Sequence, residues 1–221
     1  MDGYFSRQLM LWGEDRQKIL KSKSILIVGS GGLGCSVALA LSGSGIGRID
    51  LVDFDRVEIH NIHRQVLFNL KDCGEFKAKV ASNKIKKRNP YLKSDFFTLS
   101  FEELTNKNIK YDLIIDATDN LDVRAKIDSF AKQNGIAWIY GSVEEFNGQV
   151  CLFKSAGFDM FAKGKVTPKG IAAPMVMQIA SFEANLALRY LANLEVASDI
   201  LYYLYYNNIG EFEVKKFNLK G

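Results

Sequence analysis

Four consecutive apolar residues run directly into a cluster of glycines near the start of the chain, and this feature limits the possible folds most strongly. The stretch is residues 25–34, with the sequence ILIVGSGGLG. It predicts a buried strand, a tight turn and a helix, and three glycines match the pattern G-x-G-x-x-G: Gly29, Gly31 and Gly34. In that spacing one glycine makes the turn, one lets the backbone approach a phosphate, and one packs the helix on the strand. The free N–H groups at the helix start then attract an anion.

A second predicted strand, residues 48–53, supports a nucleotide site. It ends in Asp53, where an acid can reach a ribose. Strand, glycine turn, helix and terminal acid together favour nucleotide binding over glycines that serve only to reverse the chain.

The bulk composition limits the domain count and the class of protein. With 221 residues, 48% of them hydrophobic, the chain can bury one large core and is too short for two full-sized domains. We therefore expect a single domain over residues 1–221. The net charge of +4 predicts no nucleic-acid surface, and no apolar run approaches a membrane span. The first twenty residues are too charged for a signal peptide, so a cytoplasmic protein is expected.

Hydrophobic periodicity and turn residues predict the order of the elements. Strands are expected at about 24–29, 48–53, 96–99, 111–116, 136–143, 149–153, 200–206 and 211–219. Helices are expected at about 4–12, 16–20, 32–43, 77–88, 121–133 and 172–194. Gly148 is expected to separate the fifth and sixth strands, and residues 154–173 read as a long loop. The order predicts an α/β fold with a Rossmann-like doubly wound sheet, parallel in its N-terminal half and partly antiparallel in its C-terminal half.

More polar residues accompany the glycine turn than a dinucleotide-binding dehydrogenase needs. They are Arg7, Asp55, Asn61, Arg64, Gln65, Lys77, Asp119 and Asn120. Two cations and a carboxylate at loop ends suit a triphosphate with Mg²⁺ better than a pyrophosphate that joins two nucleosides. Taken singly, Arg64 and Lys77 could be surface cations, Arg7 an exposed helix residue, and Asp119 a helix N-cap.

With these residues, the chain resembles the ThiF/MoeB/HesA family, bacterial relatives of ubiquitin-activating enzymes, and most nearly its ThiF branch. The resemblance runs from residue 4 to about residue 219. The motifs that carry it are SRQ at 6–8, GSGGLGC at 29–35, DFD at 53–55, NIHRQ at 61–65, GEFK at 74–77, DATDN at 116–120 with Arg124, and AP at 173–174.

The resemblance implies adenylation of the C-terminal glycine carboxylate of a small ubiquitin-like sulfur carrier that ends in Gly-Gly. The carboxylate attacks the α-phosphate of ATP, which gives an acyl-adenylate and pyrophosphate. The resemblance further implies that Gly31 and its neighbours, Gly32 included, lie against the nucleotide and that Asp53 holds the ribose. It implies that Asn61, Arg64 and Lys77 hold phosphates, that Asp119 binds Mg²⁺, and that Arg7 reaches across a homodimer to the partner's ATP.

The chain also departs from the family. Many relatives carry two CxxC pairs for a structural zinc, whereas this chain has three cysteines and no CxxC, so no zinc site is expected. The 154–173 crossover loop has no cysteine to capture an activated carrier, and we expect Cys35, Cys73 and Cys151 to be buried small residues. The family's Gln-Ala-x-Glu on the last long helix becomes Glu183-Ala184-Asn185-Leu186. These departures put covalent carrier transfer in doubt and leave adenylation untouched.

Several functions remain open at this stage. The leading one is adenylation in thiamine-thiazole synthesis, which the short chain without a rhodanese-like extension favours. Other possibilities are adenylation of a molybdopterin-type carrier, a peptide or a tRNA base, and a non-catalytic partner subunit. A more remote one is an NAD-dependent oxidoreductase, for which His60 and His63 are the only imidazoles. With Asp53 and Asp55 nearby, these histidines could instead form a metal site.

Overall fold

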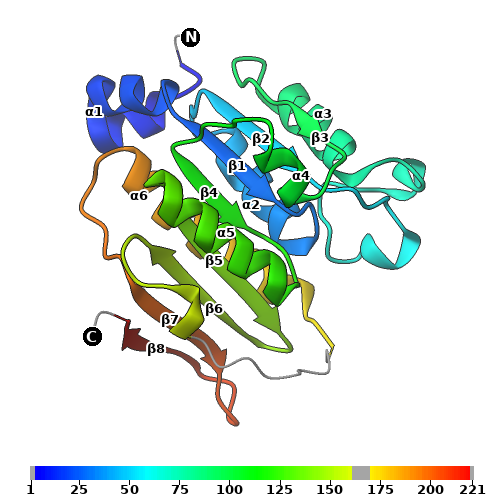
Figure 1. Cartoon of the computed structure of the whole chain (residues 1–221), viewed down its shortest axis with the longest axis vertical. Coiled ribbons are helices and arrows are strands. Elements are labelled where there is room, and N and C mark those ends of the chain that lie inside the picture. The colour runs from blue at the N-terminus through cyan, green and yellow to red at the C-terminus, as the bar shows by residue number, and fades with distance from the viewer. Residues whose placement is uncertain (1–2, 161–169, 220–221) are drawn as a thin grey trace.

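The structure is a computed structural model that describes residues 3–160 and 170–219 (Figure 1). Its α-helices are α1 (Ser6–Lys21), α2 (Gly32–Ser42), α3 (Lys77–Arg88), α4 (Phe101–Thr105), α5 (Leu121–Asn134) and α6 (Ala173–Leu191). Its strands are β1 (Ser24–Val28), β2 (Arg48–Val52), β3 (Phe96–Phe97), β4 (Leu113–Asp116), β5 (Ala137–Glu144), β6 (Asn147–Phe153), β7 (Ile200–Tyr206) and β8 (Phe212–Asn218). Three short 3₁₀ helices lie at Ile59–Asn61, Leu70–Asp72 and Phe158–Met160.

The described strands form one sheet in the order β3-β2-β1-β4-β5-β6-β7-β8. The first five in that order are parallel, and β6, β7 and β8 are antiparallel, which confirms the predicted fold class. In β1, Ile27 aligns with Leu51 of β2 on one side and with Ile115 of β4 on the other. The chain therefore changes direction across the sheet between β1 and β4, and such a switch point is where open α/β sheets bind ligands.

Helices cover both faces of the sheet. One apolar core joins α2, α3 and α6 to the face of the sheet that carries Ile25 and Ile27, and α2 and α6 pack closely together. The second core joins α4 and α5 to the opposite face, through residues such as Leu26 and Trp138. In Figure 1, α5 crosses the near face of the sheet, with α6 behind it. Strands with both faces buried read as continuous apolar runs, as residues 25–28 do.

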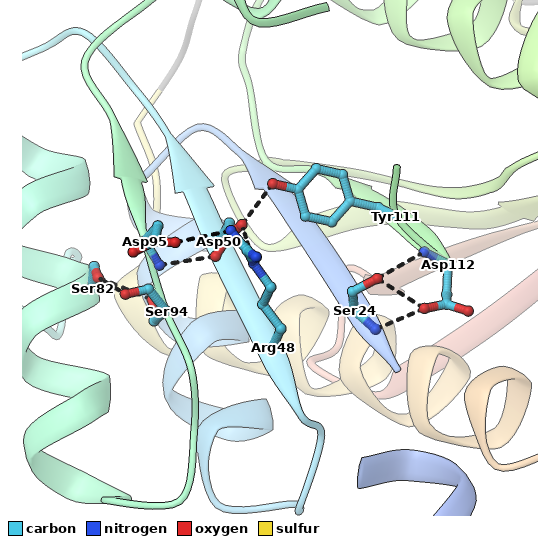
Figure 2. Close-up of polar contacts among 8 residues, drawn as sticks. All are labelled: Ser24, Arg48, Asp50, Ser82, Ser94, Asp95, Tyr111 and Asp112. Atoms are coloured by element: carbon cyan, nitrogen blue, oxygen red, sulfur yellow. Dashed lines mark hydrogen bonds and ion pairs between the residues drawn. The ribbon is translucent and has the colours of Figure 1, made fainter. Parts of the chain in front are cut away.

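A cluster of polar side chains fastens the amino-terminal half of this sheet (Figure 2). Asp50 of β2 is fully buried, and its carboxylate accepts hydrogen bonds from Arg48 Nε at 2.7 Å, Tyr111 Oη at 2.6 Å and the Asp95 N–H at 2.9 Å. The neighbouring Asp112 accepts from the N–H and the hydroxyl of Ser24, both at 2.8 Å. These bonds join β1, β2 and the segments that lead into β3 and β4.

The structure confirms the strongest sequence predictions and corrects weaker ones. The helix predicted over residues 77–88 is α3, Lys77–Arg88. The two helices predicted in the N-terminal segment form α1, which breaks at Gly13 with φ of 80°. The prediction that Gly148 separates two strands is wrong, because the β5–β6 turn lies before it, at Glu145, which has φ of 50°. Gly148 lies within β6, where an added Cβ would stand 2.5 Å from Ile179 Cγ1.

The predicted loop over residues 154–173 lies partly outside the described residues. Its described parts are a start that contains the 3₁₀ helix at Phe158–Met160 and an end that pairs with the β5–β6 turn, where the Glu145 N–H donates to Gly170 O at 2.8 Å. Over the described ranges, none of the helices has the length and apolar character needed to cross a membrane.

Candidate functional site

The glycine turn stands at the carboxyl edge of the sheet, at the switch point between β1 and β4. Gly29 has φ of +94°, and a Cβ there would lie 2.8 Å from Ala117 O, so only glycine fits. A Cβ on Gly34 would lie 2.0 Å from Gly29 O, so this glycine lets α2 pack on the turn. A Cβ on Gly32 would press on Val176 Cγ1 at 3.0 Å. Among the described residues, a Cβ on Gly31 would meet only Gln65 Nε2, at 3.9 Å, so these residues leave Gly31 open.

The start of α2 presents unused hydrogen-bonding capacity beside Gly31. No side chain among the described residues caps this helix, and its first turn holds no acidic residue. Helix N–H groups without a cap carry a partial positive charge that suits an anion. Two buried polar atoms in the same place, Ser30 Oγ and Gln65 Oε1, also lack a partner within the described parts of the chain. Buried polar atoms are almost always hydrogen-bonded, so the hydroxyl and the amide oxygen fit a ligand that has both acceptors and donors, and the helix N–H groups fit an anion.

Asp53 lies just beyond β2 and is tied to the glycine turn. One carboxylate oxygen accepts from the Ser30 N–H at 2.6 Å, and the other accepts from the Asp55 N–H at 2.8 Å. Burial raises the pKa of Asp53 and outweighs these two bonds, which lower it. The predicted ribose acid thus stands beside the glycine turn; its role toward a ribose stays a prediction.

Lys77 is not a surface cation, because its side chain is only 10% exposed. It begins α3, and its Nζ lies 2.9 Å from Asp55 Oδ2, with Asp55 exposed enough to face solvent. The Lys77 N–H also donates to Asp55 O at 2.9 Å, so backbone and side chain together fix the ammonium group at the carboxyl edge.

The segment around the 3₁₀ helix at Ile59–Asn61 carries the other predicted phosphate ligands. Asn61 is buried, and its Oδ1 accepts from the Glu58 N–H at 3.2 Å. Arg64 is half-buried; its Nη1 donates to His60 O at 3.1 Å and lies 3.0 Å from His63 Nε2. The role of Arg64 toward a phosphate stays a prediction.

The alternative metal site at the histidines does not form. His60 Nδ1 lies 3.2 Å from Glu58 Oε2, and His63 contacts Arg64. Across the described ranges, no three His, Cys, Asp or Glu side chains come close enough together to hold a metal ion.

Asp119 and Asn120 follow β4 at the same edge, and the structure separates their roles. Asn120 is the N-cap of α5, since its Oδ1 accepts from the N–H groups of Asp122 at 2.9 Å and Val123 at 3.2 Å. The reading of Asp119 as the N-cap is wrong, because the helix begins one residue too late for its side chain to reach those groups. Asp119 is exposed. Its role as a Mg²⁺ ligand stays a prediction.

Arg124, which the sequence offered only as a mark of the resemblance, holds the Asp119 segment in place. Its Nε lies 2.9 Å from Asp116 Oδ2, and its Nη2 donates to Thr118 O at 2.5 Å and to Gly141 O at 3.0 Å. Asp116 Oδ1 in turn accepts from the N–H of Thr118 at 3.0 Å and from its hydroxyl at 2.7 Å. Both backbone ends of Thr118 are thereby fixed directly before Asp119. A signal for this pairing was present in the sequence: Asp116 ends a buried strand, and a buried carboxylate needs a cationic partner such as Arg124.

Arg7 is exposed on α1 and lies away from the other predicted site residues. Gln8 and Gln17 of α1 both donate to Ser44 O, in the turn that leads into β2 at the amino edge of the sheet. The glycine turn is at the opposite edge. Within one chain, the structure does not bring Arg7 to the site.

The thiols are placed differently from one another. Cys35 and Cys151 are buried as expected, and burial raises the pKa of the Cys35 thiol to about 12. The prediction that Cys73 is buried is wrong: it is exposed, because it lies in a surface loop next to Gly74, which has φ of 85°.

Fold and site together define a doubly wound α/β protein with a glycine turn, two cations and an acid near the carboxyl edge of its sheet. The sequence profile of the ThiF family matches residues 5–220, and the chain belongs to that family. It is 37% identical over 156 residues to a sulfur carrier protein adenylyltransferase of Thermus thermophilus, an alignment that covers 67% of this chain and 56% of the relative. It is 29% identical over 203 residues to the molybdopterin-synthase adenylyltransferase of Salmonella typhimurium, covering 86% of this chain and 82% of the relative.

Solved structures show the same fold. A crystal structure of E. coli MccB with succinimide superposes with a TM-score of 0.87 at 20% identity, covering 99% of this chain and 71% of that one. The chain spans 56% of the Thermus relative and 39% of a probable adenylyltransferase/sulfurtransferase MoeZ of Mycobacterium tuberculosis, whereas it spans 82% of the Salmonella relative.

Proposed function

We propose that this protein is an adenylyltransferase that activates the C-terminal glycine carboxylate of a ubiquitin-like sulfur carrier with ATP and Mg²⁺. The observation that carries the proposal is the glycine turn: Gly31 is open, α2 is uncapped by the described residues, and Ser30 Oγ and Gln65 Oε1 are buried without partners there. The names of the relatives, which describe sulfur carrier and molybdopterin-synthase adenylyltransferases, support the substrate class. An E. coli MccB structure with ATP supports the nucleotide.

The reaction joins a carboxylate oxygen to the α-phosphorus and breaks the bond between that phosphorus and the bridging oxygen, so that pyrophosphate leaves. Magnesium, when bound, would offset the charge of the phosphates. The N–H groups of α2 and the open Gly31 would hold phosphate oxygens, and Asp53 would hold the ribose. Lys77, Arg64 and Asn61 would stabilise the negative charge that develops on the phosphates. Such chemistry needs positioning and electrostatic stabilisation and no protein nucleophile.

Asp119 would bind the magnesium ion. It is an exposed carboxylate at the carboxyl edge, and the bonds between Arg124 and Thr118 hold the segment before it rigid. Magnesium commonly takes one or two protein carboxylates and completes its shell with phosphates and water, so a single acid is sufficient.

The carrier is proposed to be ThiS-like, which would place the reaction in thiamine-thiazole synthesis. The test is ATP–pyrophosphate exchange with radiolabelled pyrophosphate, run with a ThiS-like carrier, a MoaD-like carrier and each carrier truncated by its last glycine. Exchange with the ThiS-like carrier alone is expected. Exchange only with the MoaD-like carrier would overturn the pathway, and binding of NADH without any exchange would overturn the activity.

The functional unit is proposed to be a homodimer in which Arg7 serves the partner's site. The placement of the side chains on α1 supports this proposal. Arg7 is exposed on this helix, which packs at the amino edge of the sheet, and neighbouring Met10 and Leu11 are 78% and 74% exposed. Exposed apolar side chains together on one helix are typical of an interface.

Mixing two inactive variants tests this arrangement. Arg7→Ala and Asp119→Ala homodimers are each expected to lose exchange activity. If Arg7 acts across the dimer, mixed dimers contain one intact site and one site with both lesions, so mixing restores activity. Absence of any restoration in verified mixed dimers would show that Arg7 does not act across the interface.

A further inference from the structure

Glu183 is a buried acid that the proposed reaction does not use. It lies in the middle of α6 with no exposed surface, and neither of its carboxyl oxygens has a hydrogen-bond partner among the described residues. The carboxyl group lies against Gly141 of β5, where an added Cβ would stand 2.1 Å from Glu183 Oε1. The absence of a side chain at Gly141 therefore leaves the space that the Glu183 carboxyl group occupies.

The same Gly141 lies between Glu183 and Arg124, the residue whose hydrogen bonds fix the segment before Asp119. Its carbonyl oxygen accepts from Arg124 Nη2 at 3.0 Å, and Arg124 Nε pairs with Asp116 at 2.9 Å. The Arg124 guanidinium pairs directly with Asp116, whereas Glu183 has no hydrogen bond to it. Glu183 is the surplus carboxyl, and a second buried anion without a partner is costly.

Among the described residues, the other elements that pack on α6 supply no compensating charge. Helix α6 packs on α2, β5, β6 and α1. Neither α2 nor β6 contains a charged residue, and their buried thiols, Cys35 and Cys151, have raised pKa values because of burial. On β5, burial also raises the pKa of Tyr140, and Glu144 lies half-buried at the far end; the charged residues of α1 are exposed. Burial first, and Asp116 second, raise the pKa of Glu183 well above its ordinary value, against the opposite effect of Arg124.

We propose that Glu183 is an uncharged carboxylic acid and acts as a positioning residue for the Asp119 segment, because its proton leaves Arg124 fully engaged with Asp116 and Thr118. If Glu183 ionised, its charge would compete for the guanidinium and weaken the bond to Thr118 O. The first half of this inference concerns the fold alone; the second half rests on the proposed function of Asp119.

Unfolding as a function of pH tests the uncharged state. A group whose pKa is raised in the folded protein binds its proton there more tightly than in the unfolded chain. Stability is therefore lost as pH rises from the ordinary glutamate value of 4.5 to the folded-state pKa. Glu183→Gln keeps the shape and cannot ionise. The unfolding constant of the native protein relative to that of Glu183→Gln should grow by up to about tenfold per pH unit across this window.

Two further observations make this test decisive. Glu195→Gln, an exposed residue just beyond α6, should follow the native protein at every pH. The native protein should also show the infrared carbonyl band of a protonated carboxylic acid, and Glu183→Gln should lose it. Parallel unfolding curves for the native protein and Glu183→Gln, with no band lost, would show that Glu183 is ionised.

Calorimetric binding of magnesium ATP over the same pH series tests the positioning role. The affinity of the native protein should fall as pH rises through the folded-state pKa of Glu183, while the affinity of Glu183→Gln stays level. Equal affinities at every pH, alongside diverging stability curves, would leave an uncharged acid with no positioning role. Failure of both proteins to bind at any pH would overturn the proposed function, and the unfolding curves would still decide the protonation state.

Discussion

At the amino-terminal half of the sheet, the fully buried Asp50 carboxylate accepts hydrogen bonds from three donors, on Arg48, Tyr111 and Asp95 (Figure 2). At the carboxyl edge, the equally buried Ser30 hydroxyl and the Gln65 carbonyl oxygen have no partner among the described residues. Both regions border the same sheet, yet among the described residues only the first has partners for its buried polar groups.

This difference separates structural from functional polar groups. A buried polar group that the chain satisfies adds rigidity, whereas one that it leaves open costs free energy until water or a ligand completes it. The open groups surround a glycine turn at the switch point between β1 and β4, where a ligand is expected on topological grounds as well. Substitutions at the two regions should therefore affect different measurements.

The largest expected effect is on catalysis, at Asp119. Asp119→Ala should lower the rate of carrier-dependent ATP–pyrophosphate exchange by about 10²–10³, the usual cost of losing a metal ligand or an electrostatic partner of the transition state. Its melting temperature should stay close to that of the native protein, because Asp119 is exposed and caps no helix.

The adjacent residue provides the control. Asn120→Ala removes the N-cap of α5 and should lower the free energy of unfolding by about 1 kcal/mol, while Asn120→Asp should retain it. If Asp119→Ala instead melted at a lower temperature and exchanged pyrophosphate at the native rate, Asp119 would be a structural residue and its assignment to the site would be wrong.

A smaller effect, on stability alone, is expected at Asp50. Asp50→Ala leaves the Tyr111 hydroxyl and the Asp95 N–H without their acceptor, so the free energy of unfolding should fall by roughly 3 kcal/mol in chemical denaturation. The fraction that remains folded should exchange pyrophosphate at the native rate. Asp95→Ala is the matched control: its side chain is 67% exposed, so loss of its ion pair with Arg48 should cost under about 1 kcal/mol. A folded Asp50→Ala protein with a strongly reduced exchange rate would mean that the amino-terminal cluster also serves the site.

The smallest effect is expected at Cys73. This thiol is exposed and lies outside the groups that surround the glycine turn, so Cys73→Ser should change the exchange rate by less than about twofold. Cys35→Ala and Cys151→Ala, which alter buried thiols, serve for comparison. A large loss of exchange activity in well-folded Cys73→Ser would show that Cys73 acts as a nucleophile.

The sequence predicted the order and class of the elements because their patterns are local. The apolar run at residues 25–28 and the glycines after it specify strand, turn and helix without reference to the rest of the chain. The five-residue helix α4 was missed, although its signal is present: Ser100 and Glu103 form a capping box. Asp119 and Asn120 are both good caps, so the choice between them depended on where α5 begins, which tertiary packing decides.

Patterns in the sequence did not predict the contacts between elements that are far apart in the chain. Glu183 on an amphipathic helix would ordinarily face water, and its burial follows from Gly141, forty-two residues earlier and on another element. The bonds of Arg124 to Thr118 and Gly141 likewise depend on the packing of α5 against β4 and β5. Patterns in the chain indicate which residues meet a ligand more readily than which residues hold those in place.

Amide hydrogen exchange with and without magnesium ATP reports on both regions in one experiment. Residues 30–35 at the glycine turn and the start of α2, together with residues 117–119, should become protected when the nucleotide is added, and residues 48–50 and 95 should not change. Protection at the amino-terminal cluster, or no protection at residues 30–35 under conditions where the nucleotide is bound, would contradict the assignment of the carboxyl edge as the site of adenylation.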